Sequence, residues 1–312
     1  MSIVVIGTAF VDIKGFPEAA YIPTGRNVGR VEFIHGGVSR NVAEDIGNID
    51  LRPLFVGMVD DSPMGIAVRQ NLINHKVNCD YLITTPDGLG MWLAVFDNNG
   101  DVAGSISKRP NALPLLDLFD EKGDEIFSNA DSVVLQVDLH KDIVKKVFEY
   151  AKRYHLKMYA LVSNMSIAAE RRYLLKNFDC FICNQHEAGL LFLDNYDEKT
   201  PEEMCDILAD RVVRAKIPSM VVTMGGSGSV YADMDGNKGF CPAKQVEVKD
   251  TTGAGDAFCA GVSIGLTYNK TLAEAVEIGT TLAASVITSS ENVCPRFHPE
   301  ELGLDVKIED FN

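Results

Sequence analysis

The stretch Lys249-Asp-Thr-Thr-Gly-Ala-Gly-Asp-Ala-Phe258 decides how the rest of the chain is interpreted. In it, Gly253 and Gly255 bracket one small residue, Ala254, and an apolar helical pattern begins directly after Asp256. Glycines let backbone N–H groups approach an anion closely, and a helix N-terminus adds the positive end of its dipole. The stretch therefore predicts an anion hole for a transferring phosphate, with Gly253, Ala254 and Gly255 as its catalytic backbone residues.

Asp256 lies in the first turn of the expected helix, directly after these glycines. A carboxylate beside a phosphate site can act as general base for the hydroxyl that attacks the phosphate. An acidic residue is also favoured at a helix start for electrostatic reasons alone, and short glycine motifs often occur by chance. The flanking residues Asp250–Thr252 and Ala257–Phe258 favour the catalytic interpretation.

Apolar runs rich in β-branched residues alternate with helical patterns along the chain. Helical spacing marks Lys141–Tyr154 and Leu272–Ile287, and Thr200-Pro-Glu-Glu203 has the form of a capping box with proline at its first position. Strands covered on both faces are apolar throughout, so the alternation predicts an α/β fold with a mostly parallel central sheet. The expected strands are Ile3–Ile6, Leu54–Val59, Trp92–Phe96, Val133–Val137, Met158–Val162, Cys180–Cys183, Met220–Met224 and Gly228–Ala232.

Two stretches, residues 12–36 and 88–110, interrupt this alternation. The first has prolines and glycines but no helical pattern. The second has the pattern of a hairpin, in which Met91–Phe96 and Asp101–Lys108 flank the turn Asp97-Asn-Asn-Gly100. Antiparallel elements of this kind predict a small β lid. Because no linker, repeat or low-complexity tract divides the chain, we expect residues 1–312 to form one α/β domain with the lid inserted into it.

Charge and composition exclude several classes of function. The 29 Lys and Arg residues against 44 Asp and Glu give a formal net charge of −15. The chain therefore lacks the basic footprint of a nucleic-acid-binding protein and the polybasic patch that binds an anionic membrane. No apolar run approaches the roughly 20 residues of a spanning helix, and Met1–Gly7 lacks the basic start of a signal peptide. We expect a cytoplasmic protein.

Seven scattered cysteines, an odd number, do not form a disulfide framework and agree with a reducing compartment. Cys180-Phe-Ile-Cys183 has the spacing of a redox or metal motif, but it lies in an apolar run expected to be a buried strand. Residues three apart on a strand point to opposite faces, so the two thiols cannot readily share a metal. Buried structural cysteines are the favoured interpretation.

Four motifs, in order along the chain, resemble those of the ribokinase (PfkB) family of sugar and nucleoside kinases. Asp250–Phe258 matches the family's C-terminal signature nearly letter for letter, and His35-Gly-Gly-Val-Ser-Arg-Asn-Val-Ala43 resembles its di-glycine signature. Cys183-Asn-Gln-His-Glu187 is similar to its Asn-x-x-Glu motif, and Val222-Thr-Met-Gly-Gly-Ser-Gly228 to its nucleotide loop. The resemblance covers most of the chain and implies a ribokinase-like three-layer fold with a small β lid.

The resemblance also implies a substrate site near the start of the chain. Asp12, just beyond the first strand, would accept hydrogen bonds from two sugar hydroxyls, although an isolated Asp there is equally typical of a turn. Gly36 and Gly37 would let the backbone approach the sugar, and Asn41 would donate to a hydroxyl as well as open a helix. Asp138 ends a strand where the family often places a polar group near the sugar.

A second set of residues is implied to hold ATP and metal ions. Glu187 would act on Mg²⁺ through water, which suits an ion that keeps much of its hydration shell. Asp250 and Thr252 resemble the loop that holds a monovalent cation, so K⁺ is a candidate. Residues 223–228 can also be interpreted simply as a turn into the next strand, and such a turn is compatible with ATP binding. The expected ATP-binding residues are Asn184, Thr223, Gly225, Gly226 and Gly228.

The lid region is similar to the pseudouridine kinase branch over Asp12–Pro17, Val28–Phe33, Gly36–Glu44 and Phe96–Gly100. This similarity implies transfer of the ATP γ-phosphate to the 5′-hydroxyl of pseudouridine. Ribose, fructose and sugar phosphates remain alternative acceptors, and a non-catalytic sugar or nucleoside sensor is the rival class. The intact Asp256 and glycine loop argue against a sensor. Lid-to-lid pairing is common in the family, so a homodimer is a further expectation.

Overall fold

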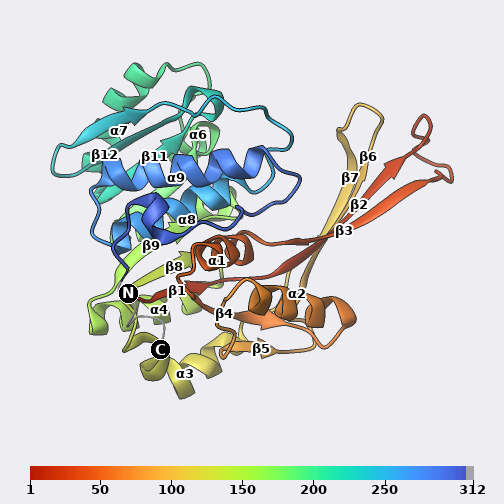
Figure 1. Ribbon diagram of the computed structural model, residues 1–312, viewed down its shortest axis with the longest axis horizontal. Coiled ribbons are helices and arrows are strands. Elements are labelled where there is room, and N and C mark those ends of the chain that lie inside the picture. The colour runs from red at the N-terminus through yellow and green to blue at the C-terminus, as the bar shows by residue number, and fades with distance from the viewer. Residues whose placement is uncertain (307–312) are drawn as a thin grey trace.

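A large twisted sheet forms the body of the protein in the computed structural model, which describes residues 1–306 (Figure 1). The strand order is β13-β12-β11-β10-β9-β8-β1-β4-β5. All neighbours from β5 to β11 pair in parallel, and only the β11–β12 and β12–β13 pairs are antiparallel. Its strands are β1 (Ile3–Ile6), β4 (Leu54–Val59), β5 (Leu82–Thr84), β8 (Ser132–Gln136), β9 (Lys157–Leu161), β10 (Cys180–Asn184), β11 (Ser219–Thr223), β12 (Ser229–Asp233) and β13 (Lys238–Cys241).

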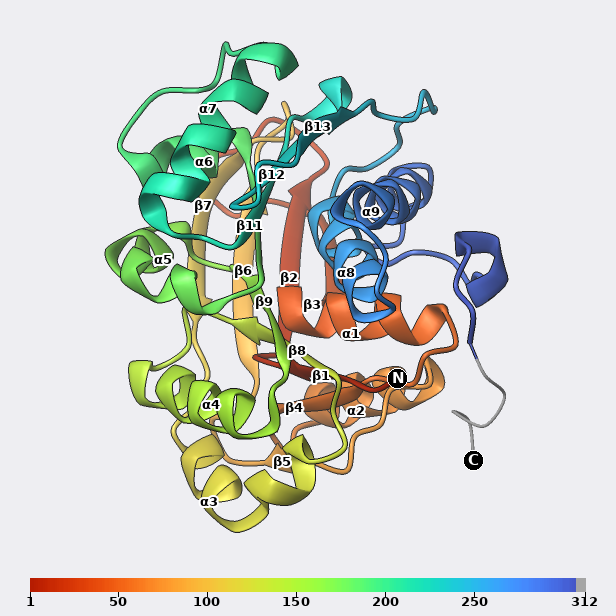
Figure 2. The ribbon, with the colours of Figure 1, turned by 90° about the vertical axis from the view of Figure 1, so that its left-hand side faces the viewer.

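Helices cover both faces of this sheet, as Figure 2 shows. α1, α2, α8 and α9 pack on one face, and α3 to α7 pack on the other. The side chains of β1 alternate between the two cores, with Val4 and Ile6 in one and Ile3 and Val5 in the other. The helices are α1 (Val38–Asn48), α2 (Pro63–Asn74), α3 (Pro114–Phe127), α4 (Lys141–Tyr154), α5 (Met165–Glu170), α6 (Gln185–Phe192), α7 (Pro201–Ala215), α8 (Ala254–Thr267) and α9 (Leu272–Ile287).

This arrangement confirms the predicted three-layer α/β fold. α4 and α9 have the predicted bounds, and α7 begins with the predicted capping box at Thr200. The two cysteines of the C-x-x-C sequence lie in different cores, Cys180 beneath the α8 layer and Cys183 on the α6 side, and both are buried and free. Strand alternation therefore separates these thiols, and burial raises the pKa of each.

A separate four-stranded sheet projects from the body (Figure 1). Its order is β3-β2-β6-β7, from β2 (Phe10–Pro17), β3 (Gly29–Gly36), β6 (Gly90–Phe96) and β7 (Val102–Lys108), and we call it the lid. The predicted small β lid is confirmed, and its two antiparallel pairs are joined by β2 and β6, which pair in parallel. β2 continues from β1 and β6 follows β5, and since β1 and β5 run in the same direction, both excursions leave the body side by side.

The predicted hairpin is the antiparallel pair β6–β7, and its ladder shifts register near Val95 and Phe96. The other antiparallel pair, β2–β3, returns to the body at Gly36 and leads directly into α1. The lid thus delivers both of its pairs to the same end of the large sheet. Within residues 1–306, no helix is long and apolar enough to cross a membrane.

Candidate active site

The glycine loop before α8 has the geometry that an anion hole requires. Gly253 precedes the helix with φ +83°, a left-handed conformation that favours glycine, and a Cβ there would lie 2.0 Å from the backbone oxygen of Asn292. No atom lies within 4 Å of the Cβ that Gly255 would carry, so the first turn of α8 is open above it. The first N–H groups of a helix have no partner within the helix and can therefore bind an anion.

Asp256 follows in the first turn of α8 and meets the helix that opens after the di-glycine pair. Asn41 of α1 donates a hydrogen bond from its side-chain nitrogen to Oδ2 of Asp256 at 2.6 Å. Burial raises the pKa of Asp256 to about 6, while the Asn41 hydrogen bond and the Arg40 charge act to lower it. A carboxyl group with such a pKa is largely ionised at neutral pH and remains a better base than an exposed aspartate.

The sequence-predicted sugar residues meet at the base of the lid. Gly36 is needed there because a Cβ would lie 2.7 Å from both carboxylate oxygens of Asp12. Gly37 has φ +95°, and its Cβ would lie 2.8 Å from the backbone oxygen of Thr8. Within residues 1–306 no protein group donates a hydrogen bond to the Asp12 carboxylate, so this carboxylate is available to a ligand. Burial raises the pKa of Asp12, opposed by the charges of Lys14 and Arg40.

Asp138 is placed differently, because protein donors already satisfy its carboxylate. Its Oδ1 accepts from the backbone N–H of Ser163 at 2.9 Å, and its Oδ2 accepts from the Ser163 hydroxyl at 2.7 Å and from Gln136 Nε2 at 3.2 Å. The oxygen of the same Gln136 side chain accepts from Thr8 and Ser39. Asp138 thus joins the ends of β8 and β9, and its sugar contact remains a prediction.

A cavity of about 340 Å³ joins the predicted nucleotide loop to the anion hole. Thr223 ends β11 and the glycines of the β11–β12 turn follow it, while Ala254 and Gly255 enter from α8. Gly228 has φ +106°, and a Cβ there would lie 2.2 Å from the backbone oxygen of Cys241, so the turn requires glycine. The remaining lining is mostly apolar and comes from Ala243, Lys244, Gln245, Val246, Val248, Thr251, Phe258, Thr280, Ala283, Ala284 and Ile287.

Asn184 and Glu187 form a capping box at the start of α6, which sequence analysis did not identify. Asn184 Oδ1 accepts from the Glu187 N–H at 2.8 Å, and Glu187 Oε2 accepts from the Asn184 N–H at 2.9 Å. Asn184 also lies beside Thr223 in the ladder of β10 and β11, and the Glu187 charge acts to raise the pKa of Asp256. Asn184 is thus the ladder neighbour of a residue that lines the nucleotide cavity, and Glu187 acts electrostatically on the predicted base.

The candidate cation residues lie just before the glycine loop. Asp250 Oδ1 accepts from the Thr252 N–H at 2.9 Å and from its hydroxyl at 2.8 Å, and the backbone hydrogen bond is the main cause of the lowered pKa of Asp250. Residues 1–306 hold no cluster of three or more His, Cys, Asp or Glu that could bind a metal. A single carboxylate, Glu187, nevertheless fits Mg²⁺, which binds ATP phosphates and keeps several waters.

Sequence analysis did not single out Arg40 or Asn292. Arg40 is 1% exposed and Asn292 belongs to the segment after α9, yet both adjoin Asn41 or Gly253. One local signal pointed to Arg40: it stands four residues before Glu44 on a helix that is buried nearly throughout, where an unpaired charge is costly. No local signal marks Asn292.

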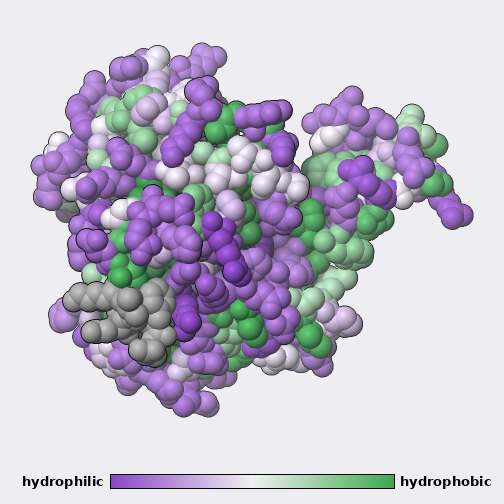
Figure 3. Space-filling model, viewed as in Figure 1, coloured by the Kyte–Doolittle hydropathy of each residue, from purple (hydrophilic) through white to green (hydrophobic). Residues whose placement is uncertain are grey.

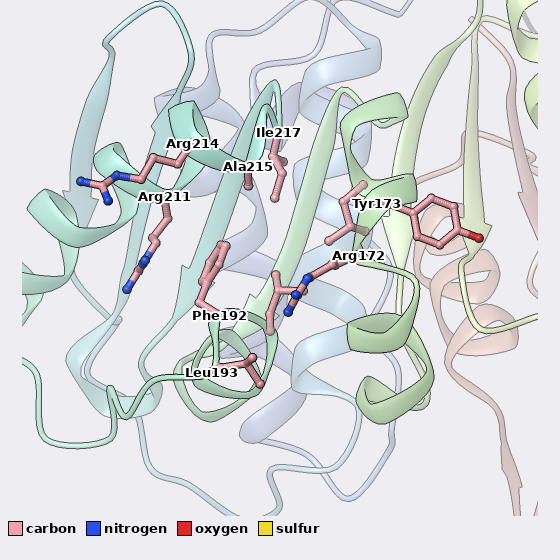
Figure 4. Close-up of a pocket in the computed structure, with 10 residues that line it drawn as sticks. Arg172, Tyr173, Phe192, Leu193, Arg211, Arg214, Ala215 and Ile217 are labelled. Carbon is pink, nitrogen blue, oxygen red and sulfur yellow. The ribbon is translucent and has the colours of Figure 1, made fainter.

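A larger hollow of about 450 Å³ lies on the opposite layer, between α7 and the segment 172–175 (Figure 4). Figure 4 shows Arg211 and Arg214 extending on one side of it and Tyr173 on the other. The two arginines are paired, Arg211 with Asp194 and Arg214 with Asp210. None of the sequence-predicted site residues lines this hollow, whereas several of them line the cavity at α8.

Comparisons with known proteins identify the family of this chain. The model of the pfkB family carbohydrate kinases matches residues 1–294. Guanosine-inosine kinase of Exiguobacterium acetylicum is 34% identical, covering 93% of this chain and 95% of its own. Pseudouridine kinase of Escherichia coli K12 is 21% identical, covering 84% and 82%. A ribokinase of Arabidopsis thaliana solved with ribose and ATP has a TM-score of 0.82 at 21% identity, covering 96% and 97%.

Fold and site together define a phosphotransferase that acts on a hydroxyl group. The chain belongs to the pfkB family of carbohydrate kinases, and it is a sugar or nucleoside kinase.

Proposed function

We propose that this kinase transfers the γ-phosphate of ATP to the 5′-hydroxyl of a nucleoside, with guanosine and inosine as its preferred acceptors. The relative that is 34% identical over nearly the whole chain is named for these two nucleosides. Pseudouridine, which the lid sequence favours, is the second candidate, because its kinase in Escherichia coli is only 21% identical. Ribose and fructose are the third.

The observation that supports a nucleoside is an aromatic cluster on the lid face that carries Asp12. Asp12 pairs with Trp92 across the β2–β6 ladder, and residues opposite each other in a ladder share a face. Farther out on this face, Phe16 stacks on Phe96 with ring centroids 4.8 Å apart, and Trp92 meets Phe96 edge-on at 6.5 Å. A nucleobase stacks favourably on such rings, whereas a free sugar has no aromatic group to place there.

The proposed reaction follows from the positions of two carboxylates. Asp12 accepts hydrogen bonds from the ribose hydroxyls at the base of the lid, and this directs the 5′-hydroxyl toward Asp256. Asp256 takes the hydroxyl proton while the 5′-oxygen forms a bond to the γ-phosphorus. The bond from that phosphorus to the β,γ-bridging oxygen breaks, and its electron pair leaves with ADP.

The nucleotide would occupy the 340 Å³ cavity, with its phosphates between the β11–β12 turn and the first turn of α8. The N–H groups at Gly255 and Asp256 stabilise the charge that develops on the transferring group. Mg²⁺ bound to the phosphates would neutralise part of their charge, and Glu187 would hold it through water. Asp250 and Thr252 would support this loop through a bound K⁺, as the family resemblance implies.

The acceptor is tested by incubating the protein with Mg²⁺, ATP and one acceptor at a time, and detecting products by mass. The panel is guanosine, inosine, adenosine, pseudouridine, uridine, cytidine, ribose, fructose and fructose phosphates, with Asp256→Asn as the blank. A 5′-phosphate formed on guanosine and inosine supports the proposal. Product on pseudouridine alone or on a free sugar would replace the acceptor, and binding without product on any of them would favour the sensor.

A further inference from the structure

Arg40 is a buried charge where the lid, the di-glycine pair Gly36–Gly37 and α8 come together. Its guanidinium is paired with Glu44, one turn along α1, at 2.6 Å, and both side chains are 1% exposed. It also donates from Nε to the Gly36 carbonyl at 3.1 Å and from Nη2 to the His35 carbonyl at 2.6 Å. A buried ion pair is costly to desolvate and is often replaceable by apolar residues, so its presence here calls for a role beyond stability.

That role is visible in the orientation of Asn41. The same Nη2 donates to Oδ1 of Asn41, whose nitrogen donates to Asp256 Oδ2 at 2.6 Å. An amide has a donating end and an accepting end, and a guanidinium only donates. Contact with Arg40 therefore places the Asn41 oxygen toward the guanidinium and its nitrogen toward the carboxylate. Rotated by half a turn, the amide would present its oxygen to Asp256 and repel it.

Arg40 reaches the anion hole through Asn292. Nη2 of Arg40 donates to Oδ1 of Asn292 at 3.3 Å, and Nδ2 of Asn292 donates to the His35 carbonyl at 2.8 Å. The backbone oxygen of Asn292 is the atom that a Cβ on Gly253 would meet. One side chain thus joins the di-glycine loop, the hydrogen-bond partner of Asp256 and the segment packed against the glycine loop.

We propose that Arg40 is a positioning residue of the phosphoryl transfer, which holds the Asn41 amide so that its nitrogen points at the Asp256 carboxylate. The inference rests on the proposed role of Asp256 as base. Arg40 itself is 1% exposed and is enclosed by the protein groups to which it donates, so it is not presented to a substrate. The hydrogen bonds from Arg40 to Asn41 and from Asn41 to Asp256 are the route by which it acts on the carboxylate.

Few charged groups compete with Arg40 for influence on Asp256. Arg40 on α1 lowers the pKa of Asp256, and Glu187 on α6 raises it. Asp45 on α1 and Cys259 on α8 also interact electrostatically with Asp256, and burial raises the pKa of each. Loss of Arg40 should therefore raise the pKa of Asp256 and shift the acidic limb of activity to higher pH, since the base acts in its ionised form.

The test pairs the variant Arg40→Gln/Glu44→Gln, which leaves no buried charge unpaired, with Arg40→Lys, which keeps the charge without the planar fork. We expect kcat of the double variant to fall about 100-fold, the order expected for a misplaced catalytic group, with little change in the KM for ATP. The carboxyl ¹³C resonance that Asp256→Asn removes should titrate at higher pH in the double variant. Arg40→Lys should lower kcat with a smaller shift of that resonance.

The matched control is Arg211→Gln/Asp194→Asn, another arginine–carboxylate pair on the opposite layer, where the guanidinium lies over the Phe192 ring. It should lower the unfolding temperature and leave kcat and the Asp256 resonance unchanged. An unshifted resonance in a folded Arg40→Gln/Glu44→Gln protein would overturn the proposal. If that double variant does not fold, the proposal would be overturned by an Arg40→Lys protein whose kcat and Asp256 titration are both those of the wild type. Activity retained by Asp256→Asn, beside a shifted resonance, would refute the base instead and leave the positioning intact.

Discussion

The two sheets of this protein differ in how their faces are covered. Helices enclose both faces of the large sheet, and every residue of β1 is at most 1% exposed. The lid has one face toward the substrate site, and on its other face Phe33 is 59% exposed and Ile106 is 70% exposed. Figure 3 shows hydrophobic residues along this projecting part. The large sheet is therefore a fixed scaffold, whereas the burial of the lid faces depends on what binds to them.

The proposed site lies where these regions meet, with one carboxylate from each. Asp256 begins a helix that packs on the large sheet, and Asp12 belongs to a lid strand. The proposed chemistry is thus held by the scaffold, and the recognition of the acceptor by the lid. Changes on the scaffold should abolish turnover or stability, and changes on the lid should alter which acceptor binds and whether two copies associate.

Asp256→Asn should have the largest effect. Without a base, kcat should fall about 10²–10⁴-fold, the usual contribution of general base catalysis, while ATP and acceptor still bind. Single-turnover kinetics together with calorimetric binding of ATP would separate the two effects. Near-normal turnover in this variant would show that the scaffold does not supply the base.

Phenylalanines in the two sheets give the next comparison. Phe55→Ala on β4 removes a side chain with no exposed surface and should lower the free energy of unfolding by about 3–5 kcal/mol. Phe33→Ala on the lid should lower it by less than about 0.5 kcal/mol in a dilute monomer, because the ring is already largely in water. Urea unfolding of both variants measures the difference. Equal losses would mean that the lid face is covered in solution.

The two lid faces should differ in their effect on the acceptor. Trp92→Ala removes a ring from the aromatic cluster and should weaken nucleoside binding by about 1–3 kcal/mol, or roughly 5- to 150-fold in KM. The matched variant is Leu93→Ala, its neighbour on the opposite face, which should leave the KM unchanged. Steady-state kinetics with inosine measure both. If Trp92→Ala leaves the inosine KM unaltered, the base does not bind to this cluster.

Much of the fold could be predicted because its elements are local. The bounds of α4 follow from one periodic apolar face, and the strands of the large sheet from short apolar runs. The parallel pairing of β2 with β6 could not be predicted from the sequence, because it depends on where two distant segments leave the body. Sequence analysis likewise named Asn184 and Glu187 by resemblance but missed their capping box. An Asn followed three residues later by a Glu fits both the family's motif and a helix cap.

The site divides in the same way. Gly253, Gly255 and Asp256 lie in one short stretch of the chain, so their proximity in space can be predicted from the sequence. Arg40 and Asn292 are 252 positions apart, and only the folded chain brings them to within 3.3 Å. Asp138 shows the converse, because the resemblance implied a polar group near the sugar, while the Ser163 hydroxyl, after a neighbouring strand, donates to its carboxylate at 2.7 Å.

The smallest effect on turnover should come from the uncovered lid face, although its effect on assembly should be clear. Ladder partners place Phe33, Ile13, Leu93 and Ile106 in one row across all four strands. An apolar row of this kind is unfavourable in water, and we propose that a second copy of the chain covers it in a lid-to-lid homodimer.

Ile106→Glu would place a charge in that row and should convert the dimer to a monomer in sedimentation velocity, with kcat changed little because Asp256 and its partners lie in the body. The matched variant is Ser105→Glu, which adds the same charge one residue away on the opposite lid face and should remain dimeric. If the wild-type protein sediments as a monomer, the proposal that a second copy covers the row is refuted. Since the row would then stay exposed in the free enzyme, Phe33→Ala should behave in urea as an exposed substitution does.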